Sequence, residues 1–218
     1  MKKLCMFDLD GTLMNTIGTI STYMNRTLSE FSLQTFSEDA YKYFVGNGAK
    51  ILTERALKAQ NAMNDETMAK VFARYNEIYD AAPYEGSAPY DGIPALLKAL
   101  AEKGVMTAVL SNKPDFATRA VVSGFFPDHP FSAVHGGREG IPLKPSPEGA
   151  LLILEELGGI LPDEVLYIGD TAVDIELGIR AGFETVGVLW GFRTEEELRA
   201  AGAAHIVRDP AEILAFLG

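Results

Sequence analysis

One short segment constrains the fold of this chain more than any other. Leu4–Phe7 is entirely apolar, runs directly into Asp8 and Asp10, and breaks at Gly11. Such a run is typical of a strand buried on both faces of a parallel sheet. Two acids at its end are costly to remove from water and require a cation or a proton. Since ligands of open α/β sheets bind beyond the carboxyl ends of the strands, this pair is expected to lie where chemistry takes place, although an exposed strand end or a helix N-cap would look the same.

Composition excludes several classes of function. The chain has 218 residues, 47% of them hydrophobic, and a formal net charge of −11. Nucleic acids and anionic membranes require clustered Lys and Arg, so neither is expected as a partner. There is no transmembrane run, and four apolar residues before Asp8 are too few for a signal peptide. Cys5, the single cysteine, is expected to be an inert core residue, which favours a cytoplasmic protein.

From Pro89 onward, strand patterns alternate with helix patterns. The predicted buried strands are Val105–Leu110, Ala133–Val134, Val165–Ile168 and Thr185–Leu189. Proline and glycine residues between them mark the starts and ends of helices. Repeated pairs of this kind predict an α/β fold, a doubly wound parallel sheet with helices on both faces.

The segment 15–82 interrupts this alternation. It contains no convincing strand and shows helical spacing throughout, so we predict an all-helical domain inserted after the first strand. The α/β core domain would then comprise 1–14 and 83–218. The insertion carries seven basic and eight acidic residues, whereas the rest carries twelve and twenty-two. A nearly neutral lid over an acidic core suits a site where the core holds a metal and the lid meets the substrate.

The ends of the predicted strands carry residue types that fit one reaction. They are Asp8 and Asp10 after the first strand, Ser111 and Asn112 after the second, Lys144 on a later loop, and Asp170 and Asp174 after a further strand. Acid clusters without Cys or nearby His favour a hard cation such as Mg²⁺ over zinc. A carboxylate can also attack phosphorus to form an aspartyl phosphate. A carboxylate about 4 Å from a dianionic phosphate is opposed by roughly 8 kcal/mol at a dielectric of about 20, which one divalent cation and one ammonium can offset.

In their order along the chain these residues resemble the haloacid dehalogenase-like hydrolase superfamily. The motifs are Asp8-Leu9-Asp10-Gly11-Thr12, Ser111-Asn112-Lys113, Lys144-Pro145 and Gly169-Asp170-Thr171-Ala172-Val173-Asp174. Within the superfamily, Val45–Ala49, Tyr90–Ile93 and Trp190–Phe192 are most similar to phosphoglycolate phosphatases and related pyrophosphatases. The resemblance implies a Rossmann-like core with the helical insertion as its cap, and Mg²⁺-dependent hydrolysis of a small phosphorylated metabolite.

The resemblance also implies a role for each motif residue. Asp8 would be the nucleophile, and Asp10 would protonate the leaving oxygen and then activate water. The Mg²⁺ ligands would be Asp8, the backbone carbonyl of Asp10, and Asp170, with Asp174 binding directly or supporting another ligand. The phosphate-binding residues would be Gly11, Thr12, Ser111, Asn112 and Lys144. The cap residues that face the substrate would be Gly46, Asn47 and Gly48, with Lys50 and Arg55 as charge partners.

Some positions depart from the pattern or carry no role in it. Asn15 stands where many relatives carry an acid that contacts the cap hinge, and Ile20 stands where the mutases carry a histidine. Lys113 is expected to point to solvent, and the three histidines fit no metal-ligand spacing. A pyrophosphatase, a sugar or nucleotide phosphatase, a phosphomutase or phosphonate hydrolase, and a non-catalytic sensor of a phosphorylated ligand remain alternatives. The oligomeric state is expected to be a monomer or a homodimer.

Overall fold

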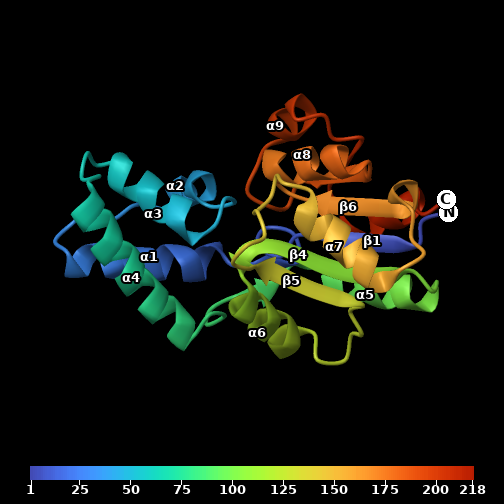
Figure 1. The fold of residues 1–218 in the computed structure, drawn as a ribbon, viewed down its shortest axis with the longest axis horizontal. Coiled ribbons are helices and arrows are strands. Elements are labelled where there is room, and N and C mark those ends of the chain that lie inside the picture. The colour runs from blue at the N-terminus through green and yellow to red at the C-terminus, as the bar shows by residue number, and fades with distance from the viewer. The chain divides into compact units, whose positions relative to one another are not determined.

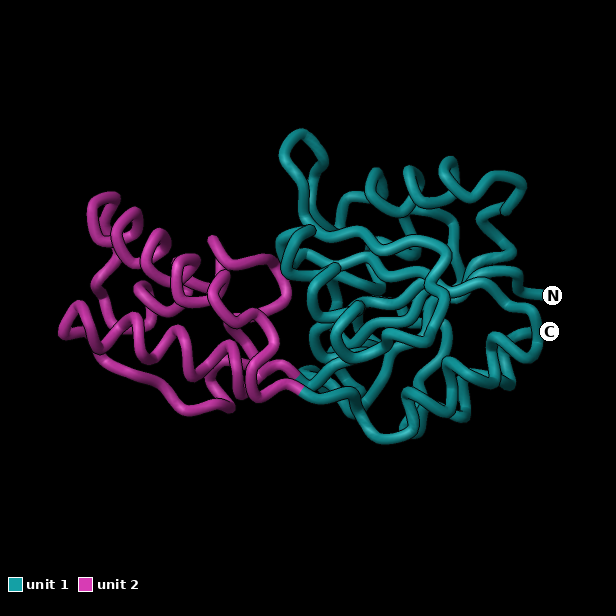
Figure 2. The backbone as a smooth tube through the Cα atoms, turned by 90° about the horizontal axis from the view of Figure 1, so that it is seen from below, with its two compact units in different colours: residues 1–15, 88–218 teal, residues 16–87 magenta.

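The computed structural model describes residues 1–218 and divides them into two compact units (Figure 2). One unit comprises Met1–Asn15 with Ala88–Gly218, and the other is Thr16–Ser87. The two boundaries between the units lie at 15/16 and 87/88, slightly later in the chain than the boundaries predicted from the sequence at 14/15 and 82/83. The later boundary has a clear cause, because the Thr19 hydroxyl donates to the carbonyl of Glu85 (2.7 Å) and contacts the Ser87 hydroxyl (2.8 Å), which ties 83–87 to the helical unit.

The first unit is built on a six-stranded sheet in the order β5-β4-β1-β6-β7-β8, with all neighbouring strands parallel. Figure 1 labels β5, β4, β1 and β6, which follow one another across the sheet. The strands are β1 Leu4–Phe7, β4 Met106–Pro114, β5 Ala133–Gly137, β6 Val165–Gly169, β7 Glu184–Val188 and β8 His205–Val207. A separate antiparallel pair, β2 Met14–Asn15 and β3 Ala88–Pro89, lies where the chain leaves and re-enters this unit. The predicted α/β fold with a parallel sheet is confirmed.

Helices cover both faces of the sheet, which explains the unbroken apolar sequence of β1. The helices of this unit are α5 Ile93–Glu102, α6 Asp115–Phe125, α7 Glu148–Leu157, α8 Ala172–Ala181 and α9 Glu195–Ala200, with 3₁₀ helices η1 Pro162–Glu164 and η2 Pro210–Phe216. Cys5 and Phe7 pack into a cluster with residues of α5, α6 and η2. Leu4 and Met6 face the opposite side and pack with residues of α7 and α8. Successive side chains of a strand point to opposite faces, so β1 needs apolar residues at every position.

The second unit contains only helices. They are α1 Ile17–Glu30, α2 Glu38–Phe44, α3 Ala49–Lys58 and α4 Asp65–Ala81. Ser37 and Asn64 cap α2 and α4 by accepting hydrogen bonds from Ala40 and Thr67 backbone N–H groups. Such caps satisfy donors that a helix start leaves unpaired. The helical spacing predicted for this part of the chain is confirmed.

The position of β1 in the sheet brings the sequence motifs together. β1 lies between β4 and β6, although these strands are far apart in sequence. The chain adds β4 and β5 on one side of β1 and returns to add β6, β7 and β8 on the other, and ligands of such sheets bind at this change of direction. The predicted end of β4 at Leu110 is wrong, because the strand continues to Pro114 and includes Ser111–Lys113.

Cys5 is fully buried, and burial raises the pKa of its thiol to about 12, which confirms an inert core residue. None of the helices is long and apolar enough to cross a membrane.

Candidate active site

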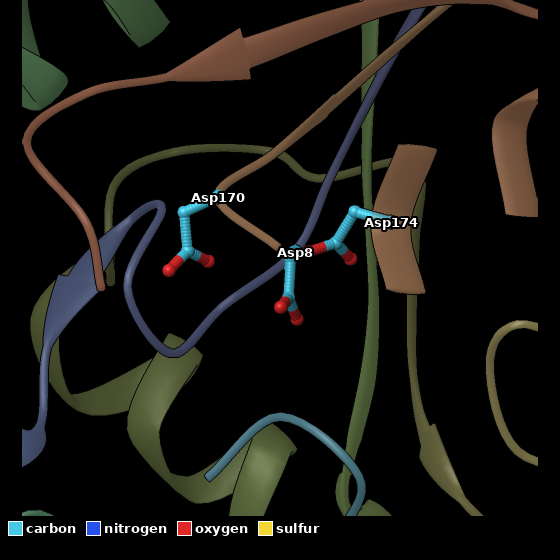
Figure 3. Close-up of side chains that lie close together, drawn as sticks. All are labelled: Asp8, Asp170 and Asp174. Carbon is cyan, nitrogen blue, oxygen red and sulfur yellow. The ribbon is translucent and has the colours of Figure 1, made fainter. Parts of the chain in front are cut away.

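Three carboxylates converge at the carboxyl end of the central strands (Figure 3). Asp8 follows β1, Asp170 follows β6, and Asp174 lies in the first turn of α8. Each contributes an oxygen that lies within 4.8 Å of the oxygens of the other two. Asp170 and Asp174 are fully buried and Asp8 is 6% exposed. The predicted acid cluster therefore forms from three separate segments of the chain.

Lys144 is the cation of this cluster. Its Nζ lies 2.8 Å from Asp8 Oδ1 and 2.8 Å from Asp174 Oδ1, and its side chain is only 3% exposed. Burial by itself disfavours the ammonium, but attraction to Asp174 and Asp8 outweighs it and raises the pKa of Lys144 well above its ordinary value. Lys144 therefore stays charged and links two of the three acids.

One ammonium does not balance three buried carboxylates. Burial, with the charge of Asp174 as a further cause, raises the pKa of Asp8 to about 7 and that of Asp170 well above its ordinary range. The unbalanced charge, the close spacing of the oxygens and the absence of sulfur or imidazole from the group all fit a hard divalent cation.

The loop after β1 and the loop after β7 hold Asp170 in place. The Thr12 hydroxyl donates to Asp170 Oδ1 (3.2 Å), and the Phe192 N–H donates to Oδ2 (2.8 Å). Gly11 and Gly191 approach so closely that a Cβ on either would lie 2.3 Å from an Asp170 side-chain atom. Gly11 also has φ +88°, a conformation that favours glycine. The role of Gly191 and Phe192 was missed from the sequence, although the resemblance included Trp190–Phe192.

Asp174 has two tasks. Its Oδ1 binds Lys144, while its Oδ2 accepts hydrogen bonds from the Thr171 N–H (3.1 Å) and the Thr171 hydroxyl (2.7 Å). The second pair of contacts caps the start of α8, where a negative charge is also favoured by the helix dipole. The spacing of Asp170 and Asp174 thus reflects a strand end followed by the first turn of a helix.

The polar residues at the end of β4 fix the lysine loop. The Asn112 amide donates to the carbonyl of Lys144 (3.1 Å), and the Lys144 N–H donates to Asn112 Oδ1 (2.8 Å). The Ser111 hydroxyl oxygen accepts the N–H of Lys113 (3.3 Å), which leaves its hydrogen to donate elsewhere. Gly11, Thr12 and Asn112 contact Asp170 or the backbone of Lys144. The binding of phosphate by these three residues and by Ser111 stays a prediction.

The prediction that the Lys113 side chain points to solvent is wrong. Lys113 is only 6% exposed, and its Nζ lies 2.9 Å and 3.2 Å from the two carboxylate oxygens of Asp10. Its place near the end of β4 turns the side chain inward, toward the loop that follows β1. The prediction rested on the motif pattern, in which this lysine follows the phosphate-binding pair and was expected to point to solvent.

The residues predicted to select the substrate lie in the helical unit. Gly46 and Gly48 have φ +108° and φ +85°, in the short loop between α2 and α3. Arg55 donates to the carbonyls of Tyr43, Phe44 and Val45, and to Asn47 Oδ1 (2.8 Å). A guanidinium is well placed at these carbonyls, because a helix ends with unpaired carbonyl oxygens. Arg55 thus holds the loop, and contact of Arg55 or the exposed Lys50 with substrate stays a prediction.

The three histidines and the tryptophan have structural contacts. His129, His135 and His205 lie against Thr107, Glu156 and Glu184, and no histidine belongs to the group of acids. Trp190, which follows β7, donates from Nε1 to the carbonyl of Thr12 (2.9 Å).

The raised pKa values of the acids predict how Mg²⁺ affects stability. A carboxyl whose folded pKa is raised binds more protons in the folded state, so metal-free stability should fall as pH rises from about 4 to about 7. Mg²⁺ at about 100 times its Kd should stabilise by roughly 2.7 kcal/mol, which corresponds to a rise in Tm of about 5–10 °C. Thermal unfolding should show this rise at pH 8 and a much smaller one at pH 5. Glu102→Gln, an exposed change on α5, should keep both results, whereas equal rises at the two pH values would contradict the account.

Comparison with known proteins gives a consistent result. The sequence model of the haloacid dehalogenase-like hydrolases matches residues 5–188. A phosphoglycolate phosphatase of Rhodospirillum rubrum is 34% identical over 224 residues, with 100% of this chain and 92% of the relative covered. One from Aquifex aeolicus is 35% identical over 190 residues, covering 87% and 86%. The crystal structure of a predicted phosphoglycolate phosphatase from Haemophilus somnus has a TM-score of 0.91 at 27% identity, covering 100% and 98%.

Proposed function

The chain belongs to the haloacid dehalogenase-like hydrolases, and we propose that it is a Mg²⁺-dependent phosphatase that hydrolyses phosphoglycolate or a closely similar small phosphate monoester. The observation that carries this proposal is the buried cluster of Asp8, Asp170, Asp174 and Lys144 at the end of the central strand. We further propose that the enzyme works in the cytoplasm, where small phosphorylated metabolites occur.

Asp8 is the nucleophile in this proposal. Its Oδ1 accepts the Leu9 N–H (2.7 Å) and contacts Lys144 Nζ, so Oδ2 is the oxygen that remains for a bond to phosphorus. Asp8 Oδ2 attacks phosphorus while the bond from phosphorus to the leaving oxygen breaks, which forms an aspartyl phosphate. The two contacts to Oδ1 fix the carboxylate for this attack and reduce the entropy that must be lost on the way to the transition state.

Asp10 is the general acid and general base in this proposal. In the first step it gives its proton to the leaving oxygen, so that the alcohol departs neutral. In the second step it takes a proton from the water that attacks phosphorus, which releases phosphate and restores the Asp8 carboxylate. Asp10 is suited to this exchange because its side chain, at 20% exposure, is more accessible than the buried acids.

Lys144 and the metal ion offset the charge of the phosphate. Asp8, Asp170 and the backbone carbonyl of Asp10 would hold Mg²⁺, with Asp174 supporting the cluster through Lys144. When bound, Mg²⁺ supplies positive charge next to the phosphate oxygens. Lys144 contributes a fixed ammonium, and Ser111 can donate its hydroxyl hydrogen. Positioning and charge supply most of the catalysis of phosphoryl transfer, so this short set of groups is sufficient.

The substrate proposal rests on the relatives and on the helical unit. The relatives compared above are phosphoglycolate phosphatases by name and cover nearly the whole chain. We propose that the helical unit acts as the cap that selects the substrate and limits access of water. Its loop Gly46–Gly48, held by Arg55, is the segment to which we assign this selection.

A panel of phosphate compounds tests the proposed function. Purified protein should release phosphate from phosphoglycolate faster than from sugar phosphates, nucleotides or pyrophosphate. The release should require Mg²⁺ and stop in EDTA. A preference for pyrophosphate or a sugar phosphate would overturn the substrate proposal. No metal-dependent release from any compound, including p-nitrophenyl phosphate, would overturn the activity and favour a non-catalytic sensor.

The assignment of substrate selection to the loop makes a separate prediction. Arg55→Ala removes the donor that holds Gly46–Gly48, so the loop should lose its fixed shape. We expect KM for phosphoglycolate to rise about tenfold, which equals roughly 1.4 kcal/mol, with little change in kcat. Lys58→Ala on the same helix is the matched control, because Lys58 is exposed and pairs only with Glu54. Equal KM values for both variants and the wild type would contradict the assignment.

A further inference from the structure

Lys113 carries a buried positive charge that has no role in the proposed mechanism. The ammonium of Lys113 is removed from water, since its side chain is only 4% exposed. Burying an ammonium is costly unless a partner compensates for it. The partner is Asp10, whose two carboxylate oxygens lie 2.9 Å and 3.2 Å from Lys113 Nζ.

The backbone of Lys113 is held firmly. Its N–H donates to the Ser111 hydroxyl, and its carbonyl accepts a hydrogen bond from the Thr118 hydroxyl (3.2 Å) at the start of α6. On the other side, Gly136 of β5 packs so tightly that a Cβ there would lie 2.6 Å from the Lys113 carbonyl oxygen. The ammonium therefore extends from a rigid part of the sheet.

The carboxylate of Asp10, in contrast, has a single partner, although the backbone of Asp10 forms a bridge with Met14. Asp10 lies in the loop between β1 and β2, and Lys113 is the only residue that forms a hydrogen bond or ion pair with its carboxylate. Without that contact the carboxylate could rotate about its side-chain bonds. General acid catalysis depends on geometry, because the acid must lie within hydrogen-bond reach of the oxygen that it protonates.

We propose that Lys113 is a positioning residue that holds the Asp10 carboxyl group through one oxygen, while the other oxygen carries the proton that passes to the leaving oxygen. This inference rests on the role of Asp10 in the proposed function. The two buried lysines then have different tasks, because Lys144 contacts Asp8 and Asp174 whereas Lys113 contacts Asp10. Lys113 acts through Asp10 and needs no contact with the phosphate.

The proposal predicts which substrates depend on Lys113. An alkoxide is a poor leaving group and needs a proton as it departs, whereas p-nitrophenolate leaves readily without one. The loss of Lys113 should therefore slow the first step, formation of the aspartyl phosphate, far more with alkyl phosphates such as phosphoglycolate than with p-nitrophenyl phosphate. A lysine that only stabilised the fold or bound the phosphate would affect both substrates equally.

Steady-state kinetics of Lys113→Met, Asp10→Asn and the double variant test this directly. We expect kcat/KM for phosphoglycolate, which reports the step in which the leaving group departs, to fall about 100-fold in Lys113→Met, as for a misplaced catalytic group, and kcat/KM for p-nitrophenyl phosphate to fall less than about threefold. In the Asp10→Asn background the second substitution should have almost no further effect, because residues that act as a unit are not additive. Lys98→Met, on the exposed face of α5, should behave as wild type on both substrates.

A chemical rescue separates positioning from misfolding. Lys113→Cys treated with 2-bromoethylamine carries an amine at nearly the original distance. The variant is made in a Cys5→Ala background, so that position 113 carries the one thiol available for alkylation. After mass spectrometry verifies alkylation, restored activity on phosphoglycolate supports the proposal, and continued loss overturns it.

The outcomes distinguish this inference from the proposed function. Equal losses on the two substrates in Lys113→Met, or a full additional loss in the Asp10→Asn background, would overturn the positioning role and leave the phosphatase proposal intact. If Asp10→Asn itself lowers kcat/KM equally for both substrates, the acid role of Asp10 fails and the role of Lys113 fails with it. If the wild type hydrolyses no phosphate ester, the proposed function fails first.

Discussion

Replacing Asp8 by asparagine is expected to abolish turnover of every phosphate ester and to leave the fold intact. An amide cannot attack phosphorus, and loss of an essential nucleophile lowers kcat by at least about 10⁴-fold. The asparagine Oδ1 can still accept the Leu9 N–H and contact Lys144 Nζ, so the surrounding structure keeps its contacts. Phosphate release from p-nitrophenyl phosphate at saturating Mg²⁺ is the measurement, because this substrate makes the least demand on Asp10 and on the helical unit.

The stability of the same variant gives an internal control. Asp8 is a buried acid whose pKa is raised to about 7, so its charge opposes folding of the metal-free protein at higher pH. Asp8→Asn should therefore unfold at a Tm equal to or above that of the metal-free wild type at pH 8. Asp163→Asn, at an exposed acid of η1, should leave both activity and Tm unchanged. Residual activity above about one hundredth of wild type would remove Asp8 from the nucleophile role.

Lys144→Met is expected to reduce both stability and activity. The substitution leaves Asp8 and Asp174 buried without their ammonium, and breaking such a pair typically costs about 3–5 kcal/mol. It also removes a fixed positive charge from the phosphate, for which we expect a fall in kcat of about 10²–10³-fold. Denaturant unfolding with and without Mg²⁺, followed by phosphate release, measures both effects.

Mg²⁺ should separate the two consequences of this substitution. Bound Mg²⁺ adds positive charge beside the same carboxylates, so it should recover part of the lost stability while the activity stays low. Lys103→Met, which removes an exposed lysine after α5, should change the free energy of unfolding by less than about 0.5 kcal/mol. A loss of less than about 1 kcal/mol in metal-free Lys144→Met would show that Lys144 does not compensate the acids.

The convergence of the acids was predictable because it follows from one rule. The carboxyl ends of parallel strands meet at the same edge of a sheet, so Asp8 and Asp170 had to approach each other once β1 and β6 became neighbours. Asp174 follows from the spacing of a strand end and a helix start. The apolar sequence of Leu4–Phe7 indicated the central, doubly covered strand that makes this possible.

Other parts of the site depend on contacts that sequence patterns do not encode. Lys113 and Asp10 are 103 positions apart, and only the extension of β4 to Pro114 turns this lysine toward the loop after β1. Asn112 and Arg55 hold backbone groups of nearby loops, contacts that the sequence did not indicate, and their binding of phosphate or substrate stays a prediction. Residue type indicates which hydrogen bonds a side chain can make, whereas its partner depends on packing of distant segments.

The central claim is that the carboxylate of Asp8 carries the phosphoryl group during turnover. Acid quenching during steady-state turnover of phosphoglycolate, followed by borohydride reduction and peptide mass spectrometry, tests it most directly, because reduction converts an aspartyl phosphate to homoserine. We predict homoserine at position 8 and at no other aspartate, only when substrate and Mg²⁺ are both present. An actively turning-over enzyme with an unmodified position 8, or with the modification at another residue, would contradict the account.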